Sequence, residues 1–132
     1  MPDAPRRWTA VALPGDCRPP AGPYSPAVRA GDLLFVSGQV PRDPRTGDVD
    51  GGDVATQARR TLANLRLALE AAGATVNDVV SVTVYLADEN DWGAFNEVYR
   101  ETFSPPYPSR TVVGARLRGV LVEVSAIAWV AR

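Results

Sequence analysis

The sequence predicts an α+β domain in which two helices cover one face of a sheet. Three observations lead to this fold class: a predicted hairpin at 27–40, a long amphipathic helix at 53–72, and valine-rich strands in the second half of the chain. With 132 residues the chain has the length of one domain. We therefore expect residues 1–132 to form a single domain, with 1–20 as an N-terminal strand and proline-rich lead-in.

The predicted hairpin consists of two extended runs, 27–30 and 33–40. They are joined by Gly31-Asp32, a pair that favours a two-residue hairpin turn. Strict alternation along the second run places Ser37 and Gly38 on opposite faces, with Ser37 at the end of an apolar row. Because a hydroxyl is an odd group for a core face, Ser37 stands out from its neighbours.

Apolar residues then recur at spacings of three and four from 53 to 72, which predicts an amphipathic helix that Asp53 can cap. The run VVSVTVYL at 79–86 is typical of a strand. A second helix begins near Asp91, and Asn96 lies beside its apolar stripe. A helical asparagine is more often solvated or bonded locally than functional, so the pattern alone leaves both interpretations of Asn96 open.

Two charged residues stand out in the last third of the chain. The proline-rich segment SPPYP at 104–108 stiffens the approach to a strand at 111–113, so Arg110 is delivered by a rigid backbone. A fixed guanidinium suits a planar anion. The last strand, near 121–130, has one apolar core face, and its other face is largely apolar but is interrupted by the carboxylate of Glu123. That carboxylate either pairs with an arginine on a strand or serves a function.

The composition excludes whole classes of chemistry. The chain has no His, and all 14 basic residues are Arg. Nucleophile–His pairs, His metal ligands, Schiff-base lysines and P-loop lysines are therefore absent. The single Cys17 rules out an intramolecular disulfide and a multi-cysteine zinc site. A net charge of -1 argues against a nucleic-acid partner.

The same sequence has no signal peptide and no apolar run long enough to cross a bilayer, which predicts a cytoplasmic protein without a membrane partner. The sheet face without helices carries large apolar side chains, namely Phe35, Ile127 and Trp129. Copies of the chain arranged with closed cyclic symmetry would cover that face, so we expect a homo-oligomer.

Five segments in order, GPYSPAV, SGQVP, DPRTGD, YPSRT and VEVSAIA, resemble the Rid family, also called YjgF, of reactive intermediate deaminases. The resemblance extends from about Ala21 to Val130. It implies a chorismate-mutase-like fold, a homotrimer with a central sheet-lined barrel, and ligand pockets between subunits. It also implies hydrolysis of 2-imino acids and their enamine tautomers to 2-oxo acids and ammonia, a form of metabolite damage control, without metal or organic cofactor.

The resemblance also implies roles for individual residues. Arg110 matches the arginine that grips the carboxylate of the imino or oxo acid, and Glu123 matches the acid that positions water and moves protons. Other matching positions line the substrate pocket: Tyr24, Ser37, Gly38 and Asn96. A ribonuclease activity is sometimes associated with the family, but this chain has no His for the common acid–base route of RNA cleavage.

Three departures from the family pattern affect the site. Val112 replaces a common cysteine, Pro26 replaces a common glutamine, and the turn at 117–123 looks one residue short. Because Arg110 and Glu123 are both present, deaminase chemistry is the favoured interpretation. The alternatives are a trimer that binds oxo acids without catalysis, possessing the same anion site, and a pathway-specific enzyme that acts on another imine.

Overall fold

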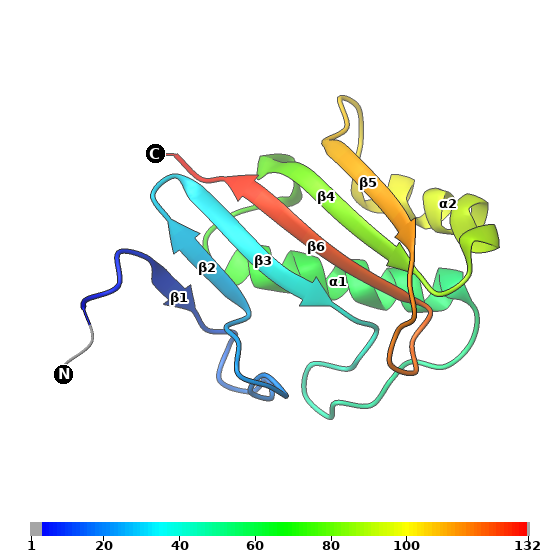
Figure 1. Cartoon of the computed structure of the whole chain (residues 1–132), viewed down its shortest axis with the longest axis horizontal. Coiled ribbons are helices and arrows are strands. Elements are labelled where there is room, and N and C mark those ends of the chain that lie inside the picture. The colour runs from blue at the N-terminus through cyan, green and yellow to red at the C-terminus, as the bar shows by residue number, and fades with distance from the viewer. Residues whose placement is uncertain (1–3, 132) are drawn as a thin grey trace.

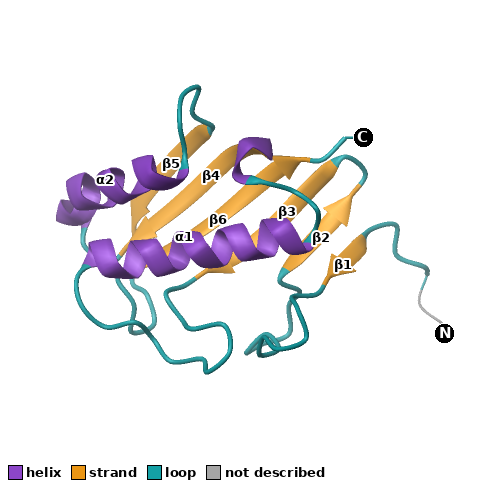
Figure 2. Ribbon diagram, turned by 180° about the vertical axis from the view of Figure 1, so that it is seen from behind, coloured by secondary structure: helices purple, strands orange, loops and turns teal. Residues whose placement is uncertain are grey.

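A computed structural model describes residues 4–131. Six strands form one sheet in the order β1-β2-β3-β6-β4-β5, and both helices lie on the same face of it (Figures 1 and 2). The main elements in chain order are β1 (Thr9–Val11), β2 (Ala27–Ala30), β3 (Leu33–Gln39), α1 (Val54–Ala71), β4 (Val79–Leu86), α2 (Trp92–Thr102), β5 (Ser109–Gly114) and β6 (Val122–Trp129). This architecture confirms the predicted α+β fold with two helices on one sheet face.

The order of the strands follows from two kinds of connection. β2 and β3 form the predicted antiparallel hairpin, and the turn between them has Gly31 at φ 61°, a conformation that glycine adopts without strain. β4 and β5 are parallel, and α2 makes the crossover between them. β6 returns to the middle of the sheet, antiparallel to both β3 and β4. The C-terminal strand therefore brings Glu123 to the centre of the sheet.

α1 runs across the sheet and supplies much of the core. The Asp53 carboxylate caps it by accepting a 2.9 Å hydrogen bond from the backbone N–H of Thr56. Its apolar stripe, including Leu62 and Leu65, is fully buried against the sheet. Each of these leucines contributes roughly 2 kcal/mol of burial free energy. The helix thus fixes the sheet against which the functional side chains are positioned.

The other face of the sheet has no helix, and it is the face turned toward the viewer in Figure 1. Two of its large side chains are exposed, Phe35 at 41% and Trp129 at 54%. Phe35 pairs with Ile127 and Leu33 pairs with Trp129, so these apolar side chains are neighbours on an uncovered face, which is typical of an interaction surface. Among the residues that the structure describes, no helix is long and apolar enough to cross a membrane. The cytoplasmic location stays a prediction.

Candidate functional site

Arg110 lies on the edge strand β5 and packs on aromatic side chains from α2. Its guanidinium carbon is 4.6 Å from the ring centroid of Tyr99, 5.0 Å from that of Trp92 and 6.0 Å from that of Phe95. Each close cation–π contact contributes about 0.5–2 kcal/mol. Between residues 4 and 131, no carboxylate lies within ion-pair distance of Arg110. The guanidinium is therefore fixed by its rings, and its N–H donors are free for an anion.

Two unsatisfied polar atoms lie beside this arginine. The amide Oδ1 of Asn96 and the hydroxyl of Tyr99 are buried without a hydrogen-bond partner in the described chain. Both residues line a cavity of about 250 Å³ together with Arg110 and Tyr107. Burial raises the pKa of the Tyr99 phenol to about 12, and the Arg110 charge opposes part of that rise. Tyr99 is thus a neutral hydroxyl at ordinary pH.

The family resemblance links Arg110 and Asn96 to one ligand, and the structure brings them together. The sequence pattern does not identify Trp92 or Tyr99 as site residues, because aromatic side chains at this helical spacing are typical of a core-facing stripe. The signal was present in their spacing: Trp92, Asn96 and Tyr99 occupy positions i, i+4 and i+7 and therefore share one face of α2.

Ser37 and Gly38 occupy a β-bulge at the end of β3. The pairing of β3 with β6 slips between Val36 and Gln39, so Ser37 and Gly38 together face one residue of β6. Gly38 consequently turns toward the carboxylate of Glu123, which lies on the face without helices. The strict alternation expected from the sequence, with Gly38 on the face opposite Ser37 and in line with Val36, is wrong here because the extra residue changes the register.

The bulge brings Gly38 so close to Glu123 that a larger residue would displace the carboxylate. A Cβ on Gly38 would lie 2.9 Å from the Glu123 Cδ and would overlap one carboxylate oxygen. Ser37 is fixed by two hydrogen bonds to the preceding loop, from its N–H to the Pro26 carbonyl (3.0 Å) and from its Oγ to the Ser25 carbonyl (2.7 Å). The bulge is therefore a rigid support for the Glu123 carboxylate.

Glu123 is half-buried, and none of the ion pairs in the described chain involves it. The structural alternative considered from sequence, an ion pair with a strand arginine, is wrong within this chain. A partly desolvated carboxylate without a cation is typical of a group that interacts with a ligand or with another subunit.

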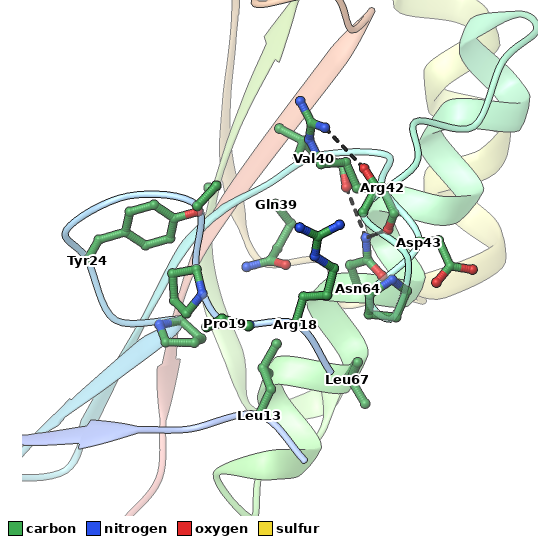
Figure 3. Close-up of a pocket in the computed structure, with 16 residues that line it drawn as sticks. Leu13, Arg18, Pro19, Tyr24, Gln39, Val40, Arg42, Asp43, Asn64 and Leu67 are labelled. Carbon is green, nitrogen blue, oxygen red and sulfur yellow. Dashed lines mark hydrogen bonds between the residues drawn. The ribbon is translucent and has the colours of Figure 1, made fainter. Parts of the chain in front are cut away.

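Tyr24 lies in the loop that precedes β2, and about half of its side chain is exposed. It lines a cavity of about 370 Å³ with Gly38 and Gln39, and Figure 3 shows its ring at one side of that cavity. Tyr24 is therefore near the β-bulge, on the same part of the molecule as Gly38.

Arg110 and Glu123 lie on opposite faces of the sheet in one chain. Arg110 pairs with Val82, which pairs with Ala126, and both partners are buried beneath the helices. Glu123 pairs with Tyr85, whose side chain is on the other face. The structure thus separates the predicted residues into an arginine half, with Asn96, and a glutamate half, with Gly38 and Ser37. One chain alone does not bring the two halves together.

Comparisons with known proteins find similarity along most of the chain. The family model described as "Endoribonuclease L-PSP" matches residues 16–130. A RutC family protein of Pyrococcus horikoshii is 50% identical over 112 residues, which cover 83% of this chain and 89% of that protein. A 2-iminobutanoate/2-iminopropanoate deaminase of Mus musculus is 45% identical over 109 residues, 81% of each chain. The crystal structure of RidA from Psychrobacter has a TM-score of 0.82 and 36% identity, and covers 89% of this chain and 98% of that one.

Proposed function

This chain belongs to the Rid family, also called YjgF or RutC, and we propose that it hydrolyses reactive 2-imino acids and their enamine tautomers to 2-oxo acids and ammonia. The observation that carries the proposal is the half-buried Arg110 guanidinium, which packs on Tyr99 and Trp92 and has no counter-ion in the described chain. A fixed guanidinium with free donors fits a carboxylate in a bidentate geometry. Imine deaminase activity among relatives supports the same chemistry.

The proposed reaction needs only a carboxylate anchor and a group that handles protons. Arg110 holds the substrate carboxylate, which orients the imine carbon. Glu123 accepts a proton from water as the water oxygen bonds to that carbon, and then delivers the proton to nitrogen. In the tetrahedral intermediate Glu123 takes the hydroxyl proton and delivers it to the amino nitrogen as the C–N bond breaks, so that ammonia leaves and the carbonyl of the oxo acid forms. General acid–base help of this kind contributes about 10²–10⁴ in rate.

We propose that two copies of the chain complete each site, because Arg110 and Glu123 lie on opposite sheet faces of one copy. One copy supplies Arg110 and Asn96, and its neighbour supplies Glu123 with Ser37, Gly38 and Tyr24. A cyclic trimer satisfies this arrangement with three equal sites. The exposed Phe35 and Trp129 on the face without helices would be buried in its centre, which supports assembly through that face.

The first experiment measures hydrolysis of freshly generated 2-iminopropionate and of a bulkier imino acid. Arg110→Ala and Glu123→Ala should each lose acceleration over buffer, while Arg116→Ala, a matched arginine change on the loop after β5, should retain it. Unchanged sedimentation of the variants excludes loss of assembly as the cause. No acceleration by the unmodified protein with either substrate would contradict the general deaminase proposal.

A mixing experiment tests whether two copies share each site. Co-refolding equal amounts of Arg110→Ala and Glu123→Ala subunits leaves about one quarter of shared sites with both groups intact. Activity should therefore return to about one quarter of the normal value. If both groups act from the same copy, the mixture stays as inactive as its components.

A non-catalytic trimer that binds oxo acids remains the second candidate, and Val112 in place of the family's common cysteine favours it. Val112 lies two residues after Arg110 and packs partly against the core, so it offers no polar contact to a substrate. This candidate predicts pyruvate binding that depends on Arg110 without measurable turnover. A specialised enzyme for another imine would show turnover only with that imine and would still need Glu123.

A further inference from the structure

A second pocket lies behind the β-bulge, on the helix side of the sheet. It encloses about 370 Å³ between the N-terminal segment, the loop after β3 and helix α1 (Figure 3). Gln39 belongs to this side because it pairs with Val124, which is fully buried beneath α1. Tyr24 and Gly38 also line this pocket, so it adjoins the part of β3 that faces the Glu123 carboxylate. Its volume is within the range of small-molecule sites in proteins.

Arg18 supplies a positive group to this pocket. Its Nη1 donates a hydrogen bond to the Thr46 carbonyl, and its backbone N–H donates to the Pro44 carbonyl at 2.7 Å. The guanidinium also packs against Gly47, where an added Cβ would lie 2.7 Å from Nη1. In the part of the chain that the structure covers, no carboxylate forms an ion pair with Arg18. The loop thus holds the guanidinium in place while other donors stay free.

Asn64 supplies a fixed acceptor next to that guanidinium. Its side chain is on α1 and is only 9% exposed, and its Nδ2 donates to the carbonyls of Val40 (2.9 Å) and Arg42 (2.8 Å). These two bonds fix the Nδ2 end of the amide and leave Oδ1 as its free end. The Oδ1 atom accepts no hydrogen bond from residues 4–131 and is not among their fully enclosed unsatisfied atoms. Figure 3 shows the Arg18 guanidinium between the Gln39 and Asn64 side chains.

The remaining walls are largely apolar and come from Leu13, Pro19, Val40 and Leu67. The pocket therefore combines anion-binding donors, a neighbouring acceptor and an apolar wall. Asp43 also lines the pocket, but its carboxylate accepts hydrogen bonds from the backbone N–H groups of Arg45 and Thr46 and forms a 3.9 Å ion pair with Arg60. A ligand that matches the Arg18 donors, the Asn64 acceptor and the apolar wall carries a negative charge, an N–H donor and a hydrocarbon part.

We propose that this pocket binds a free α-amino acid with an apolar side chain. The ligand carboxylate bonds to Arg18, its ammonium group donates to Asn64 Oδ1, and its side chain lies on the wall that includes Leu13 and Leu67. This pocket holds its anion through Arg18 and not through Arg110, and binding there does not require that the protein hydrolyses imino acids.

The experiment titrates L-leucine into ¹⁵N-labelled full-length protein and follows the side-chain amide resonances of Asn64 and Gln39, with calorimetry for affinity. Arg18→Gln should weaken binding roughly tenfold or more, because it removes a charge-assisted bond. Arg45→Gln is the matched control, since Arg45 bonds to Asp16 outside the pocket lining (2.7 Å). Arg110→Ala should leave L-leucine binding unchanged. The analogues 4-methylpentanoate and 3-methylbutylamine each lack one charged group and should bind more weakly.

Three results would overturn the proposal. The first is no shift of either amide resonance at millimolar L-leucine. The second is binding that Arg18→Gln leaves intact. The third is binding that disappears in Arg110→Ala, which would assign L-leucine to the imino acid site. Absence of imino acid hydrolysis would contradict the proposed function alone, since these binding results do not depend on turnover.

Discussion

Replacing Gly38 by alanine should disable the proposed glutamate without unfolding the protein. The added Cβ would lie 2.9 Å from the Glu123 Cδ and 3.2 Å from its Cγ, and would overlap one carboxylate oxygen. Carbon atoms in ordinary contact lie about 3.5–4.0 Å apart, so the carboxylate must move by roughly 1 Å. Because a misplacement of about 1 Å can cost about 10² in rate, kcat/KM for 2-iminopropionate should fall about 100-fold.

The assay is initial-rate hydrolysis, accompanied by thermal unfolding and sedimentation. Gly51→Ala is the matched control because an added Cβ there meets no atom within 4 Å. The same Gly38→Ala change made in a Glu123→Ala background should have no further effect on rate, since the group it displaces is already gone. A full rate for Gly38→Ala, or an equal loss in both backgrounds, would refute the reasoning that glycine acts through Glu123.

Three further predictions concern stability and assembly. Tyr99→Phe should flatten the pH dependence of the free energy of unfolding. The pKa of Tyr99 is about 12 in the folded protein against a usual 10, so the unfolded chain deprotonates first and stability falls as pH rises from about 10 to about 12. An unchanged slope of the free energy of unfolding against pH in Tyr99→Phe would contradict this prediction. Asn64→Ala should cost about 2 kcal/mol in urea unfolding, because two part-buried hydrogen bonds to the Val40 and Arg42 carbonyls are lost, while the exposed Asn77→Ala should cost little. Phe35→Asp should lower the sedimenting mass toward that of the 14.1 kDa monomer. Trp8→Asp is the control, since Trp8 lies outside the strands of the sheet, and it should leave the mass unchanged. A trimer that persists in Phe35→Asp would place the interface elsewhere.

The fold could be predicted from local patterns. The 3.6-residue repeat at 53–72 corresponds to α1 (Val54–Ala71) within one residue at each end, and the valine-rich run at 79–86 corresponds to β4 (Val79–Leu86). The strand expected at 111–113 is longer in the structure, Ser109–Gly114, because pairing with β4 extends it beyond its apolar residues. The ends of a strand depend on the strand it pairs with, so sequence patterns locate the ends of strands less well than the ends of helices.

The candidate site was predictable by residue type and not by geometry. Arg110 and Glu123 were identified as unusual charges on otherwise apolar or rigid segments. The aromatic support of Arg110 was missed, since an aromatic residue that faces a core and one that faces a cation have the same helical spacing. The position of Gly38 was missed because a β-bulge depends on the register against β6, which is distant in sequence.

The sequence by itself determined the α+β elements, the resemblance to the Rid family, and the absence of His and Lys chemistry, because periodicity, motif and composition are properties of the chain itself. Only the tertiary structure decided that Arg110 and Glu123 lie on opposite faces of the sheet, that Gly38 turns toward Glu123, and that Asn64 lines the same pocket as Arg18. Each of these facts depends on strand register or on contacts between residues far apart in the chain. Such contacts are set by the packing of the whole domain, and no local pattern records them.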